Sequence, residues 1–221
     1  MKPESRCKQR FLVVDDHEAV LAGTVPPLKA KYPDAEILTA PDRQNAQVIV
    51  QQYCPELVVL DLSIPDSPYS VANPEVGIQF LRTLIGSQQA PNIMVLSTNV
   101  QPLVRLKPLI NSYEGGFTAM DKSMPIQEML RLIDLTLRGS IYLPPQVRSR
   151  PEFERKWLEL LQLKFQEGLT DKAIAARMSV SDRTIRNYWV RVQDALGIYY
   201  EVDKDVQFQI EIEARKVGLI D

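Results

Sequence analysis

The sequence contains few of the residues that usually build metal centres or covalent cross-links. Its 221 residues include only two cysteines, Cys7 and Cys54, and a single histidine, His17. Disulfide frameworks and zinc sites need clusters of these residues, so neither kind of structure is encoded here. We therefore expect a protein of a reducing compartment, the cytoplasm.

Long apolar segments are also missing. No apolar run approaches the roughly 20 residues that a membrane span requires, and the initial MKPESRCKQR lacks the apolar core of a signal peptide. With 45% hydrophobic and 24% charged residues, the composition is that of an ordinary globular protein. We expect no association with membranes, and a length of 221 residues favours two domains, each with its own core.

Short apolar runs alternate with amphipathic stretches in the first part of the chain. The runs are FLVV, EILTA, LVVLDL, IMVLST and FTAM. Five strands that alternate with helices predict a parallel sheet covered by helices on both faces. The proline-containing segment 139–152 has the composition of a linker, and the pattern after it is helical. We therefore predict an α/β domain at 1–138, a linker at 139–152 and an all-α domain at 153–221.

Polar residues stand where the predicted strands end. Asp15 and Asp16 follow the first strand, Asp61 follows the third, Ser97 ends the fourth and Lys122 follows the fifth. The carboxyl ends of parallel strands share one edge of a sheet, so these side chains should meet there. Three carboxylates spaced by about 5 Å repel by roughly 3 kcal/mol per pair, which calls for a cation. Oxygen ligands without histidine favour Mg²⁺.

These residues, in this order and context, resemble the receiver domain of two-component response regulators. The matching motifs are DD at 15–16, VVLDLSIP, VLST and DKS. The resemblance implies a flavodoxin-like, doubly wound, five-stranded parallel domain in which Asp61 accepts a phosphoryl group from a sensor histidine kinase. It also implies that Ser97 and Lys122 contact the phosphate, and that Mg²⁺ is held by Asp15, Asp16, Asp61 and the carbonyl of Ser63.

An enzyme of another class shares part of this pattern. Aspartyl phosphatases of the haloacid dehalogenase type also combine a strand-end aspartate with magnesium, but they carry a second aspartate two residues later. Ser63 occupies that position here, which argues against a phosphatase. We therefore expect a regulator and not an enzyme. His17, beside the aspartate pair, is expected to be an exposed loop residue with no role in catalysis.

The sequence departs from the receiver pattern at three places. The segment 66–76 is longer than usual and should lie beside Asp61. Pro26 and Pro27 fall inside the first predicted helix, which should end early or kink, because an interior proline costs about 3 kcal/mol. Ala119 stands where receivers often carry an aromatic switch residue, so signal output should use another route.

The second domain contains a predicted helix-turn-helix at 168–198. Thr170 and Ser181 are placed to cap its two helices, and the second helix has one apolar stripe. That stripe consists of Ile185, Trp189, Val192 and Leu196. An upstream helix, FERKWLELLQLKFQEG, should pack against it through Trp157, Leu161 and Phe165.

The opposite face of this segment is basic. Five basic residues stand between 172 and 191 against the single Asp182. The stretch SVSDRTIRNYWVRVQDALGI resembles the recognition helix of LuxR-type domains in NarL/FixJ response regulators, which implies binding to double-stranded DNA. On that match Arg186, Asn187 and Val190 face bases, and Lys172, Thr184 and Arg191 face phosphates. Arg183 lies on the same outward face. A helical domain that binds protein instead of DNA is the alternative.

Together these features predict a phosphorylation-switched transcription regulator. Its expected partners are a sensor histidine kinase, DNA and, when active, a second copy of the chain. A final amphipathic helix carries Val206, Ile210, Ala214 and Val217 on one stripe and should end at Gly218. We expect part of this stripe to pair two copies; the alternative is that it packs on its own domain.

Overall fold

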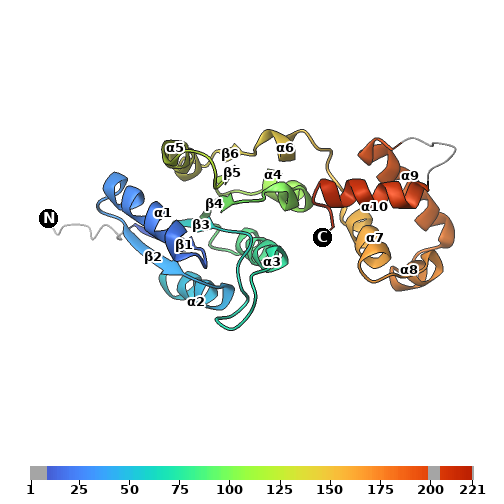
Figure 1. Cartoon of the computed structure of the whole chain (residues 1–221), viewed down its shortest axis with the longest axis horizontal. Helices are drawn as coiled ribbons and strands as arrows, with labels where there is room; N and C mark the ends of the chain where they lie inside the picture. The colour runs from blue at the N-terminus through green and yellow to red at the C-terminus, as the bar shows by residue number, and fades with distance from the viewer. Residues whose placement is uncertain (1–8, 199–204, 221) are drawn as a thin grey trace. The chain divides into compact units, whose positions relative to one another are not determined.

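The computed structural model describes residues 9–198 and 205–220, and it divides into two compact units (Figure 1). Unit 1 contains the chain up to Val100 and Leu109–Pro145. Unit 2 contains Gln101–Pro108 and the chain from Gln146 onward. The division at 145 falls within the predicted linker, whereas the sequence offers no signal that 101–108 contributes to the second unit.

Unit 1 is built on a parallel sheet with the strand order β2-β1-β3-β4-β5-β6. Its strands are β1 (Arg10–Val14), β2 (Glu36–Ala40), β3 (Leu57–Leu60), β4 (Asn92–Ser97), β5 (Phe117–Asp121) and β6 (Ile141–Tyr142). The first five coincide with the predicted strands. The sheet has six strands instead of five because β6, inside the predicted linker, pairs with β5. A strand of two residues is too short to show an alternating pattern.

Helices cover both faces of this sheet, which confirms the doubly wound arrangement (Figure 1). On one face α1 (Glu18–Lys31) packs against α5 (Ile126–Leu137), and on the other α2 (Arg43–Tyr53) packs against α3 (Pro74–Ile85). The central strands β1, β3 and β4 are buried on both faces, which explains why their sequences are continuous apolar runs. The short α4 (Lys107–Asn111) precedes β5.

The prediction for the first helix was an early end or a kink at its prolines, and the early end does not occur. Helix α1 continues through Pro26 and Pro27 to Lys31. Proline removes the N–H groups that would bond to the carbonyls of Ala22 and Gly23, but both of these residues are exposed, so water can satisfy the carbonyls.

Tertiary contacts then hold the far end of α1. Leu28 is fully buried, and Lys31 and Tyr32 bond to the Asp134 carboxylate of α5. Burial, together with the hydrogen bond to Asp134, raises the pKa of Tyr32 above its usual value. Burial alone would raise the pKa of Asp134, but the bonds from Lys31 and Tyr32 lower it. These contacts offset the local cost of the two prolines.

Unit 2 is helical, as predicted. It contains the 3-10 helix η1 (Gln101–Leu106) and the helices α7 (Arg155–Phe165), α8 (Asp171–Arg177), α9 (Asp182–Leu196) and α10 (Val206–Lys216); α6 (Pro145–Arg148) lies at the boundary between the units. The predicted caps are confirmed: Thr170 accepts from the N–H of Ala173, and Ser181 accepts from the N–H of Thr184. Helix α9 packs against α7, α8 and α10, and its apolar stripe lies in the core.

The closing helix buries the stripe that we expected to be partly free. Ile210, Ala214 and Val217 are between 0 and 4% exposed, and Val206 is half-buried against the same core, so the stripe packs on its own unit. The exposed apolar residues of α10 are instead Phe208 and Ile212, at 61% and 51%. Gly218 follows the helix with a positive φ, as a helix-ending glycine should.

Among the described residues, no helix combines the length and the apolar character that crossing a membrane requires.

One glycine fixes how α3 approaches the sheet edge. A Cβ added at Gly77 would lie 2.0 Å from the carbonyl oxygen of Leu62, which follows Asp61 directly. Only glycine therefore lets α3 pack on this backbone. By contrast, a Cβ at Gly23, in the middle of α1, would meet nothing within 4 Å.

We expect Gly77→Ala to lower the free energy of unfolding by about 1–3 kcal/mol or more, the usual cost of overpacking. The matched control, Gly23→Ala, should raise it by about 0.5–1 kcal/mol, because alanine is the better helix former. Urea denaturation followed by circular dichroism measures both. Equal stability of the two variants would contradict the close packing of α3 on Leu62.

Candidate functional site

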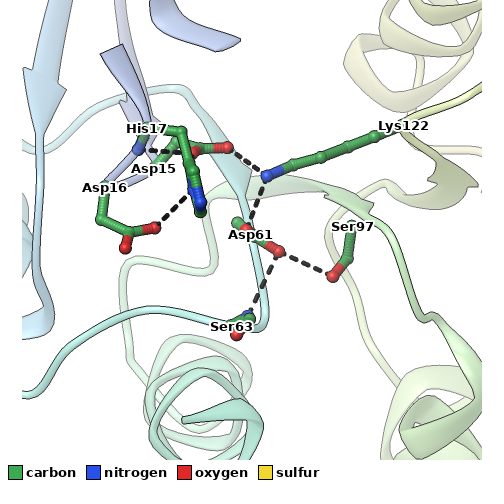
Figure 2. Close-up of polar contacts among 7 residues, drawn as sticks. All are labelled: Asp15, Asp16, His17, Asp61, Ser63, Ser97 and Lys122. Atoms are coloured by element: carbon green, nitrogen blue, oxygen red, sulfur yellow. Dashed lines mark hydrogen bonds and ion pairs between the residues drawn. The ribbon is translucent and has the colours of Figure 1, made fainter. Parts of the chain in front are cut away.

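Four strands deliver the predicted polar residues to one edge of the sheet (Figure 2). The backbone hydrogen bonds between neighbouring strands continue just beyond the strand ends and fix the positions of these residues. The N–H of Asp15 donates to Ala40, that of Asp61 to Val14, and that of Lys122 to Ser97. The side chains of Asp15, Asp61, Ser97 and Lys122 therefore converge, as the sequence predicted.

The Asp61 carboxylate lies at the centre of this cluster. Asp61 is only 3% exposed. The Ser97 hydroxyl donates to Asp61 Oδ1 at 2.6 Å, and the backbone N–H of Ser63 donates to the same oxygen at 3.2 Å. The Nζ of Lys122 lies 2.6 Å from Oδ2 (Figure 2). Both oxygens of the buried carboxylate are thus paired, and its charge is compensated.

A single ammonium group serves two buried carboxylates. Besides Asp61, the Nζ of Lys122 lies 2.6 Å from Asp15 Oδ2, and Asp15 is only 2% exposed. Burial alone would lower the pKa of Lys122, but its bonds to Asp15 and Asp61 outweigh burial and raise the pKa. Lys122 is therefore positively charged at neutral pH.

Asp16 has a different environment from the other two aspartates. Its Oδ1 is buried and accepts no hydrogen bond from the residues that the structure describes, although His17 Nδ1 lies 2.9 Å away. Oxygens of Asp15, Asp16 and Asp61 and a ring nitrogen of His17 lie within 4.8 Å of one another. A buried acceptor without a donor, beside two further carboxylates, fits a hard cation.

His17 lies closer to the aspartates than we expected. Its side chain is 61% exposed, as predicted for a loop residue. Its backbone N–H nevertheless donates to Asp15 Oδ1 at 2.9 Å, and its ring lies 3.2 Å from the same oxygen. Sequence alone does not show this contact, because it depends on the turn that follows β1.

The long segment after Asp61 is ordered by contacts at both ends. Ile64 and Asn73 form an antiparallel bridge that closes the loop, and α3 starts directly after it at Pro74. Arg43 bonds to Asp66 and ties the loop to the start of α2. The tip is highly exposed, with Tyr69 at 99%. Whether this loop controls access to Asp61 stays a prediction.

In unit 2 the residues predicted to contact DNA lie on α8 and α9. Six are exposed: Lys172, Arg183, Arg186, Asn187, Val190 and Arg191. Thr184 is half-buried, and its hydroxyl lies 2.9 Å from that of Ser181 at the start of α9. Apart from Val190, which is 53% exposed, this surface is polar and basic.

Asp171 positions this surface and was missed by the sequence analysis. Its carboxylate accepts from Trp189 Nε1 at 3.2 Å and from Lys164 Nζ at 3.2 Å. These bonds link α8 to both α9 and α7. An acidic residue at the start of a helix is a signal that the sequence does contain. Its bond to Trp189 is not visible in the sequence, because the two residues lie 18 positions apart.

Comparison with known proteins gives relatives over nearly the whole chain. The DNA-binding transcriptional activator DevR/DosR of Mycobacterium tuberculosis is 26% identical over 205 residues, which cover 86% of this chain and 88% of DevR/DosR. The transcriptional regulatory protein YdfI of Bacillus subtilis is 22% identical, with 85% and 89% covered. No family model matches.

These relatives support the resemblance to NarL/FixJ response regulators that the sequence indicates. Among solved structures, a complex of the response regulator RcsB with DNA covers 95% of this chain and 99% of RcsB, with 18% identity and a TM-score of 0.57. RcsB of Salmonella enterica serovar Typhimurium bound to a promoter gives a TM-score of 0.58 at 19% identity. These structural likenesses support the fold of a response regulator.

The pairing of Lys122 with both Asp15 and Asp61 can be tested by measuring stability, without assuming a function. We expect Lys122→Met to lower the free energy of unfolding by about 3–5 kcal/mol in the presence of a chelator, because it leaves Asp15 and Asp61 buried without a counter-charge. The exposed control Lys172→Met should change it by less than about 0.5 kcal/mol. Similar losses in both variants would argue against the bridging role of Lys122.

Proposed function

We propose that the chain is a two-component response regulator in which phosphorylation of Asp61 controls DNA binding by unit 2. The observation that carries this proposal is the convergence on one buried carboxylate of a serine hydroxyl, a backbone N–H and a lysine ammonium. The three come from the ends of three different strands. The relatives, which include a DNA-binding transcriptional activator, support it.

In this proposal the nucleophile is a carboxylate oxygen of Asp61. It forms a bond to phosphorus while the bond between phosphorus and the histidine nitrogen of a sensor kinase breaks, leaving an acyl phosphate on the aspartate. Lys122 is already charged and within 2.6 Å, so it can pair with a phosphate oxygen as negative charge arrives. The Ser97 hydroxyl is placed to donate to another.

Mg²⁺ is the cofactor that these residues fit. Asp15, Asp16 and Asp61 would hold it, with the carbonyl of Ser63 as a further ligand. The Oδ1 of Asp16 supports this assignment, because it is buried and accepts no hydrogen bond from the described residues, and such an acceptor otherwise loses free energy. When bound, the ion supplies charge neutralisation for the phosphoryl oxygens.

We expect Asp61→Asn to abolish labelling of the chain by acetyl phosphate in Mg²⁺, since the amide is not a nucleophile. The control is Asp121→Asn. Asp121 is also a strand-end aspartate, but hydrogen bonds from the side chain and from the backbone N–H of Ser123 lower the pKa of its carboxyl group. This variant should be labelled like the native chain, and a chelator should stop labelling of both. Unchanged labelling of Asp61→Asn would disprove the site.

For unit 2 we propose sequence-specific binding to double-stranded DNA. Helix α9 is capped by Ser181, packs on three helices through one face and exposes Arg186, Asn187 and Val190 on the other. Such an outward polar face is what entry into a major groove requires. A protein partner is less well supported, because the excess of basic residues on this face fits phosphates.

Two basic residues should behave differently in DNA binding. Arg186→Ala should relax sequence preference at one base pair, with a loss of about 1–3 kcal/mol for the preferred sequence. Lys172→Ala should weaken binding to all DNA sequences alike. It should also reduce by about 1 the slope of the logarithm of the binding constant against the logarithm of the salt concentration. Fluorescence anisotropy on sites selected from genomic DNA measures both effects. Equal, sequence-independent losses would show that the register of α9 on DNA is wrong.

We further propose that active chains pair through α10. Phe208 and Ile212 are one turn apart and exposed, so they form an apolar strip on this helix. A second copy related by a two-fold axis would bring two such strips together and place two α9 helices on a paired site.

Phe208→Glu should therefore weaken binding to a paired DNA site by about tenfold or more, while leaving binding to a half-site unchanged. Gln207→Glu adds the same charge on α10 and serves as the control. Val217→Glu is unsuitable as a test because Val217 is buried and its replacement should unfold unit 2. If Phe208→Glu weakens both sites equally, α10 is not the pairing surface.

A further inference from the structure

Unit 2 contains an open pocket between the first turn of α7 and the middle of α9. Its volume is about 330 Å³, and it is lined by Glu154, Lys156, Trp157, Asn187, Tyr188 and Arg191. These residues come from the two helices and from the position directly before α7, and the helices pack against each other. The pocket therefore lies within one unit, beside residues of α9 that are predicted to contact DNA.

The indole N–H of Trp157 lacks a partner in this pocket. Its Nε1 is buried and makes no hydrogen bond with the residues that the structure describes. An indole nitrogen can only donate, and a buried donor without an acceptor is destabilising. The other tryptophan of the chain, Trp189, donates from Nε1 to the Asp171 carboxylate at 3.2 Å. Trp157 thus needs an acceptor of the kind that Trp189 already has.

The ring of Trp157 is held in place by apolar contacts. As predicted, it packs against the core of unit 2, and it meets the Phe153 ring edge to face with the centroids 6.3 Å apart. This packing keeps the N–H from turning toward another acceptor of the protein. A ligand in the pocket can supply the acceptor instead.

The groups around the pocket favour an anion. Lys156 and Arg191 contribute two positive charges, and Asn187 adds an amide. Lys156 Nζ lies 5.2 Å from the centre of the Tyr188 ring, a cation–π contact that holds it beside α9. Glu154, directly before α7, makes no side-chain bond to the first N–H groups of that helix, and a helix N-terminus attracts negative charge.

The one acidic residue of the lining already pairs with one of these cations. Glu154 Oε2 lies 2.6 Å from Lys156 Nζ, and both side chains are about half exposed. An ion pair this exposed contributes little to stability. An incoming anion can therefore take Lys156 from Glu154, and this exchange opens the way to Trp157.

We propose, on the basis of the proposed function, that this pocket binds a phosphate of the DNA backbone and that Trp157 Nε1 donates to one of its oxygens. Lys156 and Arg191 pair with the same phosphate. The phosphate is that of DNA because Asn187 and Arg191 also belong to the exposed face of α9 that carries the predicted DNA contacts. The contact adds affinity without reading a base.

Replacement of single DNA phosphates tests this contact in the full chain, with acetyl phosphate and Mg²⁺ present. Trp157→Phe removes the N–H and keeps an aromatic ring, so affinity for a duplex with a selected genomic site should fall by about tenfold, the effect of one bond to a charged group. A methylphosphonate placed at each backbone position in turn removes one charge. At one position it should weaken binding of the native chain about fivefold more than binding of Trp157→Phe.

The matched control is Trp189→Phe. It also removes an indole N–H, but one that donates within unit 2. Its DNA binding should respond to each methylphosphonate as binding of the native chain does. Circular dichroism checks that both variants remain folded.

A second measurement follows the native chain itself. Its two tryptophans give two indole N–H signals in a nitrogen-15 spectrum, and Trp189→Phe identifies which is which. The Trp157 signal should shift when the duplex is added, because the proton gains a charged acceptor. A methylphosphonate at the position found above should abolish the shift. Inorganic phosphate, at the same concentration of phosphate groups, should not produce it.

The outcomes separate this inference from the proposed function. A chain that binds no DNA sequence overturns both. A chain that binds the selected site, but for which no methylphosphonate position distinguishes the native chain from Trp157→Phe, overturns the inference alone. A Trp157 signal that does not respond to the duplex, or that responds equally to inorganic phosphate, overturns it as well.

Discussion

The ion pair between Lys122 and two buried aspartates is the interaction on which the site depends. Asp15 and Asp61 are both nearly inaccessible, and two carboxylates in such surroundings would each cost several kcal/mol without a partner. One ammonium group, 2.6 Å from each, makes the arrangement stable before any ligand arrives. Under the proposed function, the same charge is in place to pair with a phosphoryl group on Asp61.

This arrangement follows from the sheet. Because β1, β3, β4 and β5 are parallel, residues at their carboxyl ends necessarily share an edge, and the ladder hydrogen bonds set their depth. Gly77 lets α3 pack on the backbone next to Asp61, so α3 supports the loop that follows Asp61. The fold itself therefore brings these polar groups together at one edge of the sheet.

The strand-end residues could be predicted from sequence because each apolar run is continuous and ends at a polar residue. The capped helices of unit 2 were predictable for a similar reason, since Thr170 and Ser181 stand directly before amphipathic stretches. Other features depend on distant partners. The continuation of α1 past Pro26 relies on contacts with α5, and the two-residue β6 exists only because β5 offers it an edge.

The assignment of Gln101–Pro108 to unit 2 is the clearest case of information that sequence does not carry. Val104 and Arg105 resemble any partly apolar stretch between a strand and a helix, and only the packing around Gly218 reveals their role. Likewise, the sequence suggested that Val217 was free for a partner, whereas the structure buries it and leaves Phe208 exposed. Amphipathic patterns identify an apolar face but not what covers it.

The central claim is that phosphate on Asp61 changes DNA binding by unit 2, and an affinity titration tests it most directly. Binding of the full chain to a selected genomic site would be measured with and without acetyl phosphate and Mg²⁺, beside Asp61→Asn. The account predicts that affinity shifts by about fivefold or more on labelling, within the usual range of coupling between sites, and that Asp61→Asn does not respond. An affinity that is identical for fully labelled and unlabelled native chain would contradict the account.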